Sequence, residues 1–325
     1  MIQVVLIGVG AGAAAALLFA SVTSGLGFSV ILFYLAPLPI MIAALGWSHW
    51  AGLAAAVTAA AMLGSAFGIF FFGTFLTSVG APAWWLGYLA LLGRPVTNGG
   101  AAAHMEWYPP GRLVLWAAVL GAAVIVGALV ALGGDESTIR SGLKGALDQV
   151  LRLQTGAPAD VPLRLPGIRD ADRLIDMLVA VLPPAAAVIA AITQAGNLWL
   201  AGQAVKLSGR LRRPWPDLTA LSFPPLTVAV FGALLAGSFL PDLPGLVASL
   251  CAATLTVAFA TVGFAVLHTI TRGMQGRAAM LSGAYGVIAL LIWPIVVMTL
   301  FGVAETLFGL RPRLSKRGPP VAPKT

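Results

Sequence analysis

Three amide side chains stand within the apolar stretch ITQAGNLWLAGQAV and are the residues best suited to contact a ligand. Gln194 and Asn197 are three residues apart on one helical face, and Gln203 is expected more nearly on that face than opposite it. An unpaired amide in hydrocarbon costs several kcal/mol, so these groups must turn toward other helices or toward a cavity. They therefore either form hydrogen bonds between helices or line a pocket for a small solute.

The N-terminal sequence matches the pattern of a nucleotide-binding turn. Gly8-x-Gly10-x-x-Ala13, within MIQVVLIGVGAGAAAALLF, has the spacing of a dinucleotide fingerprint. Such a site needs an acidic residue about 20 positions later to hold the ribose hydroxyls, and the first acidic residue here is Glu106. We therefore expect a transmembrane helix. Its small residues recur every fourth position and would let another helix approach closely: Gly8, Gly12 and Ala16, and also Ala11 and Ala15.

The other residues capable of chemistry favour no reaction. His104-x-Glu106 begins like a zinc deaminase motif, but no Cys-x-x-Cys can follow because Cys251 is the single cysteine. His49 and His268 lie at the ends of predicted spans, where the polarity of the membrane interface accounts for them. Carboxylate pairs are missing from the apolar stretches, which argues against a proton-coupled pump. We expect no enzyme, no metal site and no cofactor.

The composition indicates that lipid is the main solvent of this chain. Of its 325 residues 59% are hydrophobic and only 9% are charged, and the mean hydropathy is +0.95. Soluble domains carry about 25% charged residues, so this chain cannot cover a water-facing surface. The formal charge of +8 lies in short segments between apolar runs, as in the loops of membrane proteins. We therefore expect the lipid bilayer, and no nucleic acid, as a partner.

Runs of about 20 apolar residues predict an all-α, polytopic transmembrane helical bundle of about 8–9 membrane segments. The segment 74–93 is interrupted by Gly73, Gly80 and Pro82, and we expect a broken or re-entrant helix there. The predicted spans are residues 2–20, 29–46, 51–72, 74–93, 112–132, 183–205, 224–240, 245–269 and 279–303. The predicted organisation is N-terminal transmembrane helices (1–132), a polar insertion (133–182), C-terminal transmembrane helices (183–309) and a basic disordered tail (310–325).

The polar insertion begins with an amphipathic helix. Apolar residues share one helical face, and charged residues follow another at four-residue spacing. The apolar set is Ile139, Leu143, Leu147, Val150 and Leu151. Asp135 or Ser137 is the expected N-cap. A proline-rich linker follows, and a second helix is predicted from Asp170 through Leu182 toward Pro183-Pro184.

The basic residues predict the orientation in the membrane. The loop 206–217 carries four bases and should be cytoplasmic, which places the insertion outside. Nine spans would then place the tail RPRLSKRGPPVAPKT outside, although it carries five bases. Either one segment does not cross, or one of the segments 74–93 and 279–303 is doubled or re-entrant. We expect the tail to be cytoplasmic, with the chain in a bacterial inner membrane.

The chain resembles the YybS-like family of bacterial membrane proteins, a domain of unknown function (DUF 2232). The resemblance rests on LFYLAPLPIMIAALGW, on the span that holds Asn197, on RPWPDLTALSFP, and on FGVAETLFGLRPR with Gly302, Glu305 and Arg311. It covers nearly the whole chain, to about Arg313. It implies that the N-terminal half is similar to the substrate-binding membrane subunits of energy-coupling-factor transporters. Those subunits bind vitamins or metal ions, and they dock to a membrane partner through small residues of their first helix. By that resemblance the docking face would be Ala11 and Ala15, or Gly8 and Gly12.

These observations favour a multi-pass inner-membrane protein that binds a small solute or a lipid. It would act as a transporter-type subunit, because the sequence has neither a phosphate-binding loop nor acidic residues within the spans to energise transport by itself. The alternative is a membrane scaffold that recruits partners through its basic tail and its amphipathic insertion.

Overall fold

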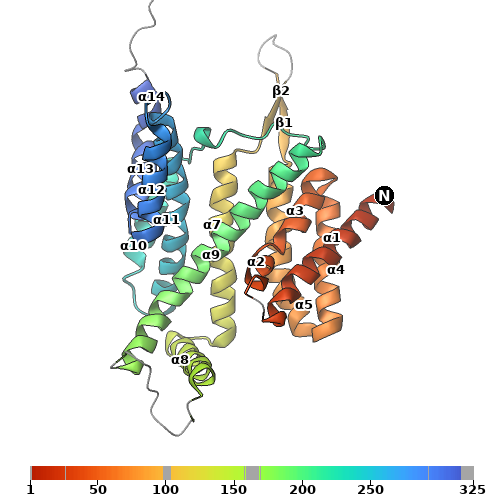
Figure 1. The fold of residues 1–325 in the computed structure, drawn as a ribbon, viewed down its shortest axis with the longest axis vertical. Coiled ribbons are helices and arrows are strands. Elements are labelled where there is room, and N and C mark those ends of the chain that lie inside the picture. Colours follow the sequence, from red (N-terminus) through yellow and green to blue (C-terminus); the bar gives the residue numbers. More distant parts are fainter. Residues whose placement is uncertain are drawn as a thin grey trace, which may run out of the picture. The chain divides into compact units, whose positions relative to one another are not determined.

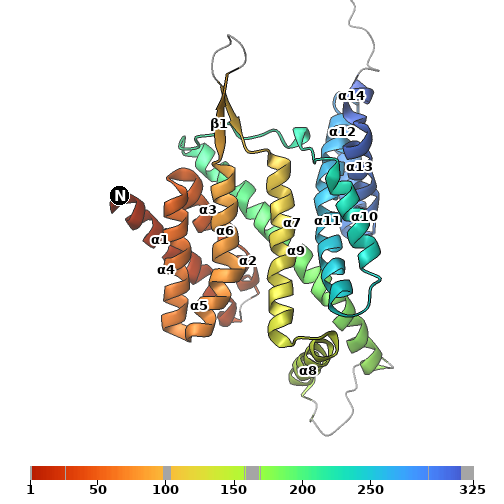
Figure 2. The same ribbon diagram turned by 180° about the vertical axis from the view of Figure 1, so that it is seen from behind.

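The computed structural model describes residues 2–25, 27–97, 104–156, 158, 168, 170–291 and 293–315. The predicted all-α, polytopic helical bundle is confirmed for these residues (Figures 1 and 2). The helices and strands are α1 (Ile2–Ala20), α2 (Ser29–Tyr34), α3 (Pro37–Gly46), α4 (His49–Phe67), α5 (Ile69–Phe75), α6 (Ala81–Ala90), β1 (Gly93–Val96), β2 (His104–Trp107), α7 (Pro110–Leu132), α8 (Glu136–Thr155), α9 (Ala171–Leu207), α10 (Leu226–Gly237), α11 (Asp242–Ile270), α12 (Arg277–Leu291), α13 (Ile295–Phe308) and α14 (Leu310–Ser315).

Seven helical segments of the described chain are long and apolar enough to cross a membrane. They are Ile2–Ser24, Ser29–Gly46, His49–Phe67, Ile69–Ala90, Pro110–Leu132, Ala171–Leu207 and Asp242–Ile270. The expected count of about 8–9 segments also included 224–240 and 279–303, which form the shorter apolar helices α10, α12 and α13.

The residues form two compact units that do not follow chain order. Unit 1 consists of Met1–Ala117, Ile192–Ala229 and Thr256–Thr325, and unit 2 of Ala118–Ala191 and Val230–Leu255. The predicted insertion therefore belongs to the same unit as parts of α7, α9, α10 and α11.

In unit 1, α1 packs against α4 through its small residues, and the two helices lie side by side in Figures 1 and 2. A Cβ on Gly8 would lie 2.6 Å from the Cβ of Ala54, and one on Gly12 would lie 2.6 Å from the carbonyl oxygen of Ala55. The stretch is helical throughout, so the strand and turn that a nucleotide fingerprint requires are not formed. Buried on this helix are Gly8, Gly12, Ala15 and Ala16, while Ala11 is half-buried.

The small residues of α1 contact a helix of the same chain. Residues of α4 fill the space beside Gly8 and Gly12. Large apolar side chains occupy the rest of the helix surface, as expected for contact with lipid: Ile2, Val5, Leu6, Val9 and Leu17 are exposed.

The fourth predicted span differs from the expectation. The chain breaks earlier, at Gly68, whose φ of +99° ends α4 and begins α5. Beyond it, α5, a π-helical turn (Leu76–Gly80) and α6 continue as one segment of 22 residues. The expected re-entrant break at Gly73 and Gly80 is therefore wrong, because the wider turn keeps the helix continuous.

A two-stranded hairpin that the sequence analysis missed follows α6. Strands β1 and β2 are antiparallel, with Gly93 opposite Trp107 and Val96 opposite His104. Arg94 and Glu106 face each other, and the Nε–Oε2 distance is 2.7 Å. The His104-x-Glu106 motif thus lies on an exposed strand with its carboxylate paired to an arginine.

The predicted span 279–303 is a helical hairpin. The Tyr285 hydroxyl of α12 lies 2.8 Å from the His268 Nε2 of α11, and the Tyr285 ring stacks on Phe264. Helix α13 packs on the same stretch of α11, where Thr299 donates a 2.9 Å hydrogen bond to the carbonyl oxygen of Thr256. Both helices can lie along one stretch of α11 only if the chain reverses between them, at Trp293-Pro294 (Figures 1 and 2).

In unit 2, the amphipathic helix α8 packs on apolar residues of α7, α9 and α11. Asp135 is its N-cap and accepts a hydrogen bond from the Thr138 N–H; side-chain and backbone bonds from Ser137 and Thr138 lower the pKa of Asp135 to about 2. Ile139 is 1% exposed. It belongs to an apolar core with Ala122, Leu129, Ala187 and Leu250.

Helix α9 is longer than predicted. It continues from Ala171 through Pro183 and Pro184 to Leu207, so the helix predicted from Asp170 and the span predicted from residue 183 are one element. Prolines are tolerated inside such helices when neighbouring groups satisfy the freed carbonyls. Most of the predicted proline-rich linker, and residues 316–325 of the predicted tail, lie outside the described residues. The start of that tail, expected to be disordered, forms α14.

Candidate functional site

The candidate site in unit 1 includes a break in the second predicted span. Helix α2 ends at Tyr34 and α3 begins at Pro37, so this span is discontinuous near its middle. The Leu38 N–H, which would bond to the Tyr34 carbonyl in a regular helix, donates to the Leu35 carbonyl instead at 3.0 Å. The carbonyl oxygen of Tyr34 is thereby available to a side chain from another helix.

Asn197 of α9 uses that carbonyl. Its Nδ2 donates to the carbonyl oxygens of Tyr34 and Thr193, each at 2.8 Å. Both partners are pure acceptors, so the amide nitrogen must face them and Oδ1 must point elsewhere. Asn197 is 4% exposed, and its Oδ1 is buried without a hydrogen-bond partner among the described residues.

Gln194 provides a second oxygen of the same kind. Its side chain is also 4% exposed, and its Oε1 has no hydrogen-bond partner in the described part of the chain. Gln194 and Asn197 precede Leu207, the end of α9, by about 20 and 15 Å along the helix axis at 1.5 Å per residue. These distances place both amides near the middle of a hydrocarbon core about 30 Å thick.

Gln203 does not join them. It follows Gln194 by nine residues, about 2.5 turns of an α-helix, and therefore lies on the opposite side of α9. The expectation that Gln203 shares their face is wrong for this reason. The residue is half-buried and forms no hydrogen bond with the residues that the structure describes.

The two buried oxygens define the chemistry that this site can perform. Amide oxygens accept hydrogen bonds from N–H and O–H groups or coordinate hard cations, and neither carries a negative charge. No group of three or more His, Cys, Asp or Glu suited to a metal ion occurs among the described residues. Amide oxygens of this kind can pair with N–H or O–H donors or with a single positive charge, and amides supply neither acid–base nor nucleophilic chemistry.

A second polar region lies at one end of unit 1, which we call the basic end. It is formed by the loop that follows α9, residues 208–225, which we call the basic loop and which contacts the ends of two other helices there. Arg212 Nη2 donates to the Trp47 carbonyl at 3.1 Å, and Arg213 Nη1 donates to the Ala90 carbonyl at 2.9 Å. The loop therefore gathers its arginines over the ends of α3 and α6.

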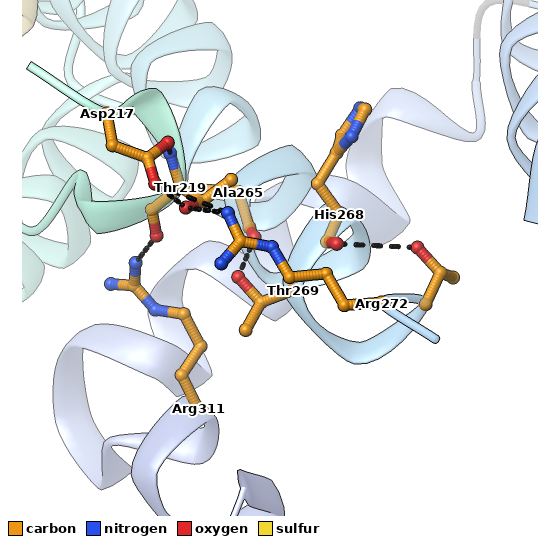
Figure 3. Close-up of polar contacts among 8 residues, drawn as sticks. Asp217, Thr219, Ala265, His268, Thr269, Arg272 and Arg311 are labelled. Atoms are coloured by element: carbon orange, nitrogen blue, oxygen red, sulfur yellow. Dashed lines mark hydrogen bonds and ion pairs between the residues drawn. The ribbon is translucent and has the colours of Figure 1, made fainter. Parts of the chain in front are cut away.

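The same loop is joined to the C-terminal helices at the basic end (Figure 3). Arg272, just after α11, lies 3.2 Å from Asp217 Oδ2, and its Nη2 bonds to the Thr219 hydroxyl at 2.7 Å. Bonds from Thr219 are the largest cause of a lowered pKa at Asp217, and Arg272 adds to it. Asp217 therefore stays ionised where it meets Arg272.

Arg311 of α14 is the most connected residue of this end. It donates to the carbonyl oxygen of Thr219 (Figure 3). It also donates to the carbonyl oxygen of Leu221, and its Nε lies 2.7 Å from Glu305 Oε1. The Arg311 backbone N–H also donates to Glu305 Oε2 at 2.9 Å. Glu305 is only 8% exposed, so this pair is well shielded from water.

The remaining histidines lie among aromatic side chains. His268 Nε2 is 2.8 Å from the Tyr285 hydroxyl. His49 lies against Trp50 and Tyr88, with ring centroids 4.7 and 5.2 Å apart. Tryptophan and tyrosine collect at membrane interfaces, which agrees with the predicted positions of these histidines at span ends.

Comparison with protein-family models, curated proteins and solved structures finds no match to this chain.

Sequence reasoning missed the part of the site that is not a side chain. The Tyr34 carbonyl has no signal of its own, but Pro37 and Pro39 mark a place where two helical donors are lost. It also missed Arg213 and Trp215 of the basic loop, which lie in a small hollow. Among the three arginines of residues 208–225, nothing in the sequence distinguishes Arg213, which becomes buried.

Proposed function

We propose that this chain is a multi-pass protein of the bacterial inner membrane that binds a small solute within unit 1. It acts as a transporter-type subunit without energising machinery of its own, in agreement with its resemblance to the YybS-like family. The observation that carries the proposal is the pair of buried oxygens without partners, Gln194 Oε1 and Asn197 Oδ1.

A purely structural role explains these oxygens poorly. A buried polar atom left without a partner costs about 1–3 kcal/mol, and here two of them lie one helical turn apart. A solute with N–H or O–H groups would supply the missing donors. Membrane transporters also place substrates near the middle of the bilayer beside discontinuous helices, as the break between α2 and α3 provides.

The substitution Gln194→Met separates the two roles. It keeps the length of the side chain and removes the unpaired oxygen, so the protein without solute is expected to be as stable or more stable, by up to about 1–3 kcal/mol. Stabilisation by the bound solute is expected to disappear. The measurement is the melting temperature of detergent-purified protein with water-soluble vitamins, primary amines, monovalent cations and lipids.

Gln203→Met is the matched control, because it makes the same chemical change on the opposite side of α9. It should leave every solute-induced shift as in the parent protein. The proposal is wrong, and the amide is structural, if two results are found together. These are that no compound shifts the melting temperature of the parent protein and that Gln194→Met melts well below Gln203→Met.

We also propose that the basic end faces the cytoplasm. Gly8 of α1 meets Ala51 and Ala54 near the start of α4, and Gly12 meets Ala55 and Thr58 further along, so both helices start at this end. The first six spans then alternate and return the chain to the basic loop. The hairpin of α12 and α13 removes the ninth crossing, so Arg311 also lies with that loop.

Cysteine labelling tests this orientation. After Cys251→Ser removes the native thiol, single Ser141→Cys and Ser315→Cys variants are treated with a membrane-impermeant maleimide. Ser141→Cys, in α8, should react in spheroplasts, and Ser315→Cys, in α14, only after permeabilisation. Labelling at position 315 in sealed spheroplasts would overturn the proposed orientation.

A membrane scaffold is the second candidate function. The observation in its favour is the apolar surface near the end of α8, where Val150 is 49% and Leu153 is 77% exposed. Such side chains are available to another protein. The melting experiments distinguish the two functions, because a scaffold predicts no solute whose effect depends on Gln194.

A further inference from the structure

A hollow of about 70 Å³ lies in unit 1, beside the basic loop. Its lining includes Leu113 and Val114 of α7, Leu198 and Trp199 of α9, and Arg213 and Trp215 of the loop. The surroundings are apolar except for one guanidinium. Trp199 and Leu218, which also line it, are 41% and 51% exposed, so the hollow opens at the surface of the helices.

Arg213 is the unusual member of this lining. It is only 4% exposed, and its Nε is buried without a hydrogen-bond partner among the described residues. Among the described residues its one hydrogen bond, from Nη1 to the Ala90 carbonyl, is to a neutral group, and no described carboxylate forms an ion pair with it. Burial lowers the pKa of Arg213 from its ordinary value. A buried charge is costly unless it is paired, so the hollow favours an anion.

Trp215 adds a second unused donor. Its Nε1 is buried without a hydrogen-bond partner in the described chain. The indole ring is wedged against Gly202 of α9, where a Cβ would overlap the ring. Two N–H donors on a fixed loop, surrounded by hydrocarbon, suit an oxyanion that is attached to an apolar chain.

We propose that Arg213 and Trp215 bind the head group of an anionic membrane lipid, with its acyl chain along Leu198 and Trp199. The guanidinium pairs with a phosphate oxygen, the indole N–H donates to another, and the lipid enters through the exposed side of the hollow. Basic pockets between membrane helices select anionic head groups in this way. Gln194 and Asn197 are not among the residues that line the hollow, and the lipid proposal does not depend on the proposed solute.

Native mass spectrometry of the detergent-purified protein tests the assignment. The full chain is titrated with phosphatidylglycerol, with phosphatidylcholine, and with inorganic phosphate. Phosphatidylglycerol is expected to bind at least about tenfold more tightly than phosphatidylcholine. Arg213→Met should weaken phosphatidylglycerol about tenfold, because it keeps the apolar stem and removes the charge. Arg212→Met is the matched control: it removes the adjacent arginine, which bonds to Trp47, and should change affinity by less than about twofold.

A second variant covers the possibility that Arg213→Met does not fold. Trp215→Phe keeps an aromatic ring at this position of the loop but removes the indole N–H together with part of the ring that lies against Gly202, so a loss of about threefold to tenfold is expected. Equal binding of both lipids overturns the proposal, and so does equal loss in the Arg212 and Arg213 variants. Complete release of the lipid by millimolar inorganic phosphate would show that the site belongs to a free anion, which also overturns it.

Discussion

Gly302→Val is expected to lower the free energy of unfolding by about 3 kcal/mol, at the upper end of the cost of overpacking. Gly302 of α13 lies directly against α11, and a Cβ there would overlap the carbonyl oxygen of Phe259. Gly263 of α11 has the reciprocal relation to the carbonyl of Met298. Both obstacles are backbone atoms, so a side chain fits only if the helices separate. Separation would also break the bond from Thr299 to the Thr256 carbonyl.

The measurement is thermal unfolding of the purified protein in detergent, followed by intrinsic fluorescence and by the monodisperse fraction in size-exclusion chromatography. Gly283→Val is the matched control, since a Cβ on that glycine of α12 meets no atom within 4 Å. It should unfold within a few degrees of the parent protein. Similar losses in both variants would mean that the contact between α11 and α13 is not as close as described.

The membrane spans were predictable because the signal that defines them is local. Lipid requires about 20 apolar residues in a row, and such runs stand out in a chain with few charges. The hairpin of α12 and α13 was predicted only as one of the alternatives that the basic tail left open. Residues 279–303 have the length and composition of a single span, and only Trp293-Pro294 indicates a turn. The chain reverses there because both helices pack on α11, and that contact is not encoded in any local pattern.

The candidate site was predictable in part. Gln194 and Asn197 are found from the sequence because amides are costly in lipid, and their three-residue spacing places them together. Gln203 was misplaced because its spacing of nine residues from Gln194 corresponds to about 2.5 turns, which puts it on the opposite side of α9. The Tyr34 carbonyl depends on how the backbone bonds rearrange at Pro37 and Pro39. The burial of Arg213 depends on the path of a loop, for which the sequence has no periodic signal.

Strands β1 and β2 and helix α14 were not predicted, for a different reason. Strands β1 and β2 have four residues each, too few for alternation to be visible, and they carry Arg94 and Glu106 at the paired position. Helix α14 was expected to be disordered because it begins a basic tail. Its start is instead held by Arg311, which bonds to two carbonyls of the basic loop.

Arg311→Met is expected to lower the free energy of unfolding by about 3–5 kcal/mol, the usual cost of removing one partner of a buried ion pair. The Arg311 and Glu305 side chains are 14% and 8% exposed, so the substitution leaves a shielded carboxylate without its partner. It also leaves the carbonyl oxygens of Thr219 and Leu221 without their donor. The loop should then separate from α14, which makes the amides of residues 217–221 exchange faster with deuterium.

A double-mutant cycle distinguishes the loss of the ion pair from the loss of the carbonyl contacts. Glu305→Gln removes the charge that Arg311→Met would strand, so the double variant should be more stable than Arg311→Met alone. Arg313→Met, two residues further along α14 and exposed, is the control and should change stability by less than about 0.5 kcal/mol. If the double variant is no more stable than the single one, the carbonyl contacts alone hold α14 to the loop. If Arg311→Met and Arg313→Met unfold alike, the Arg311 network does not join the C-terminal helices to the basic loop.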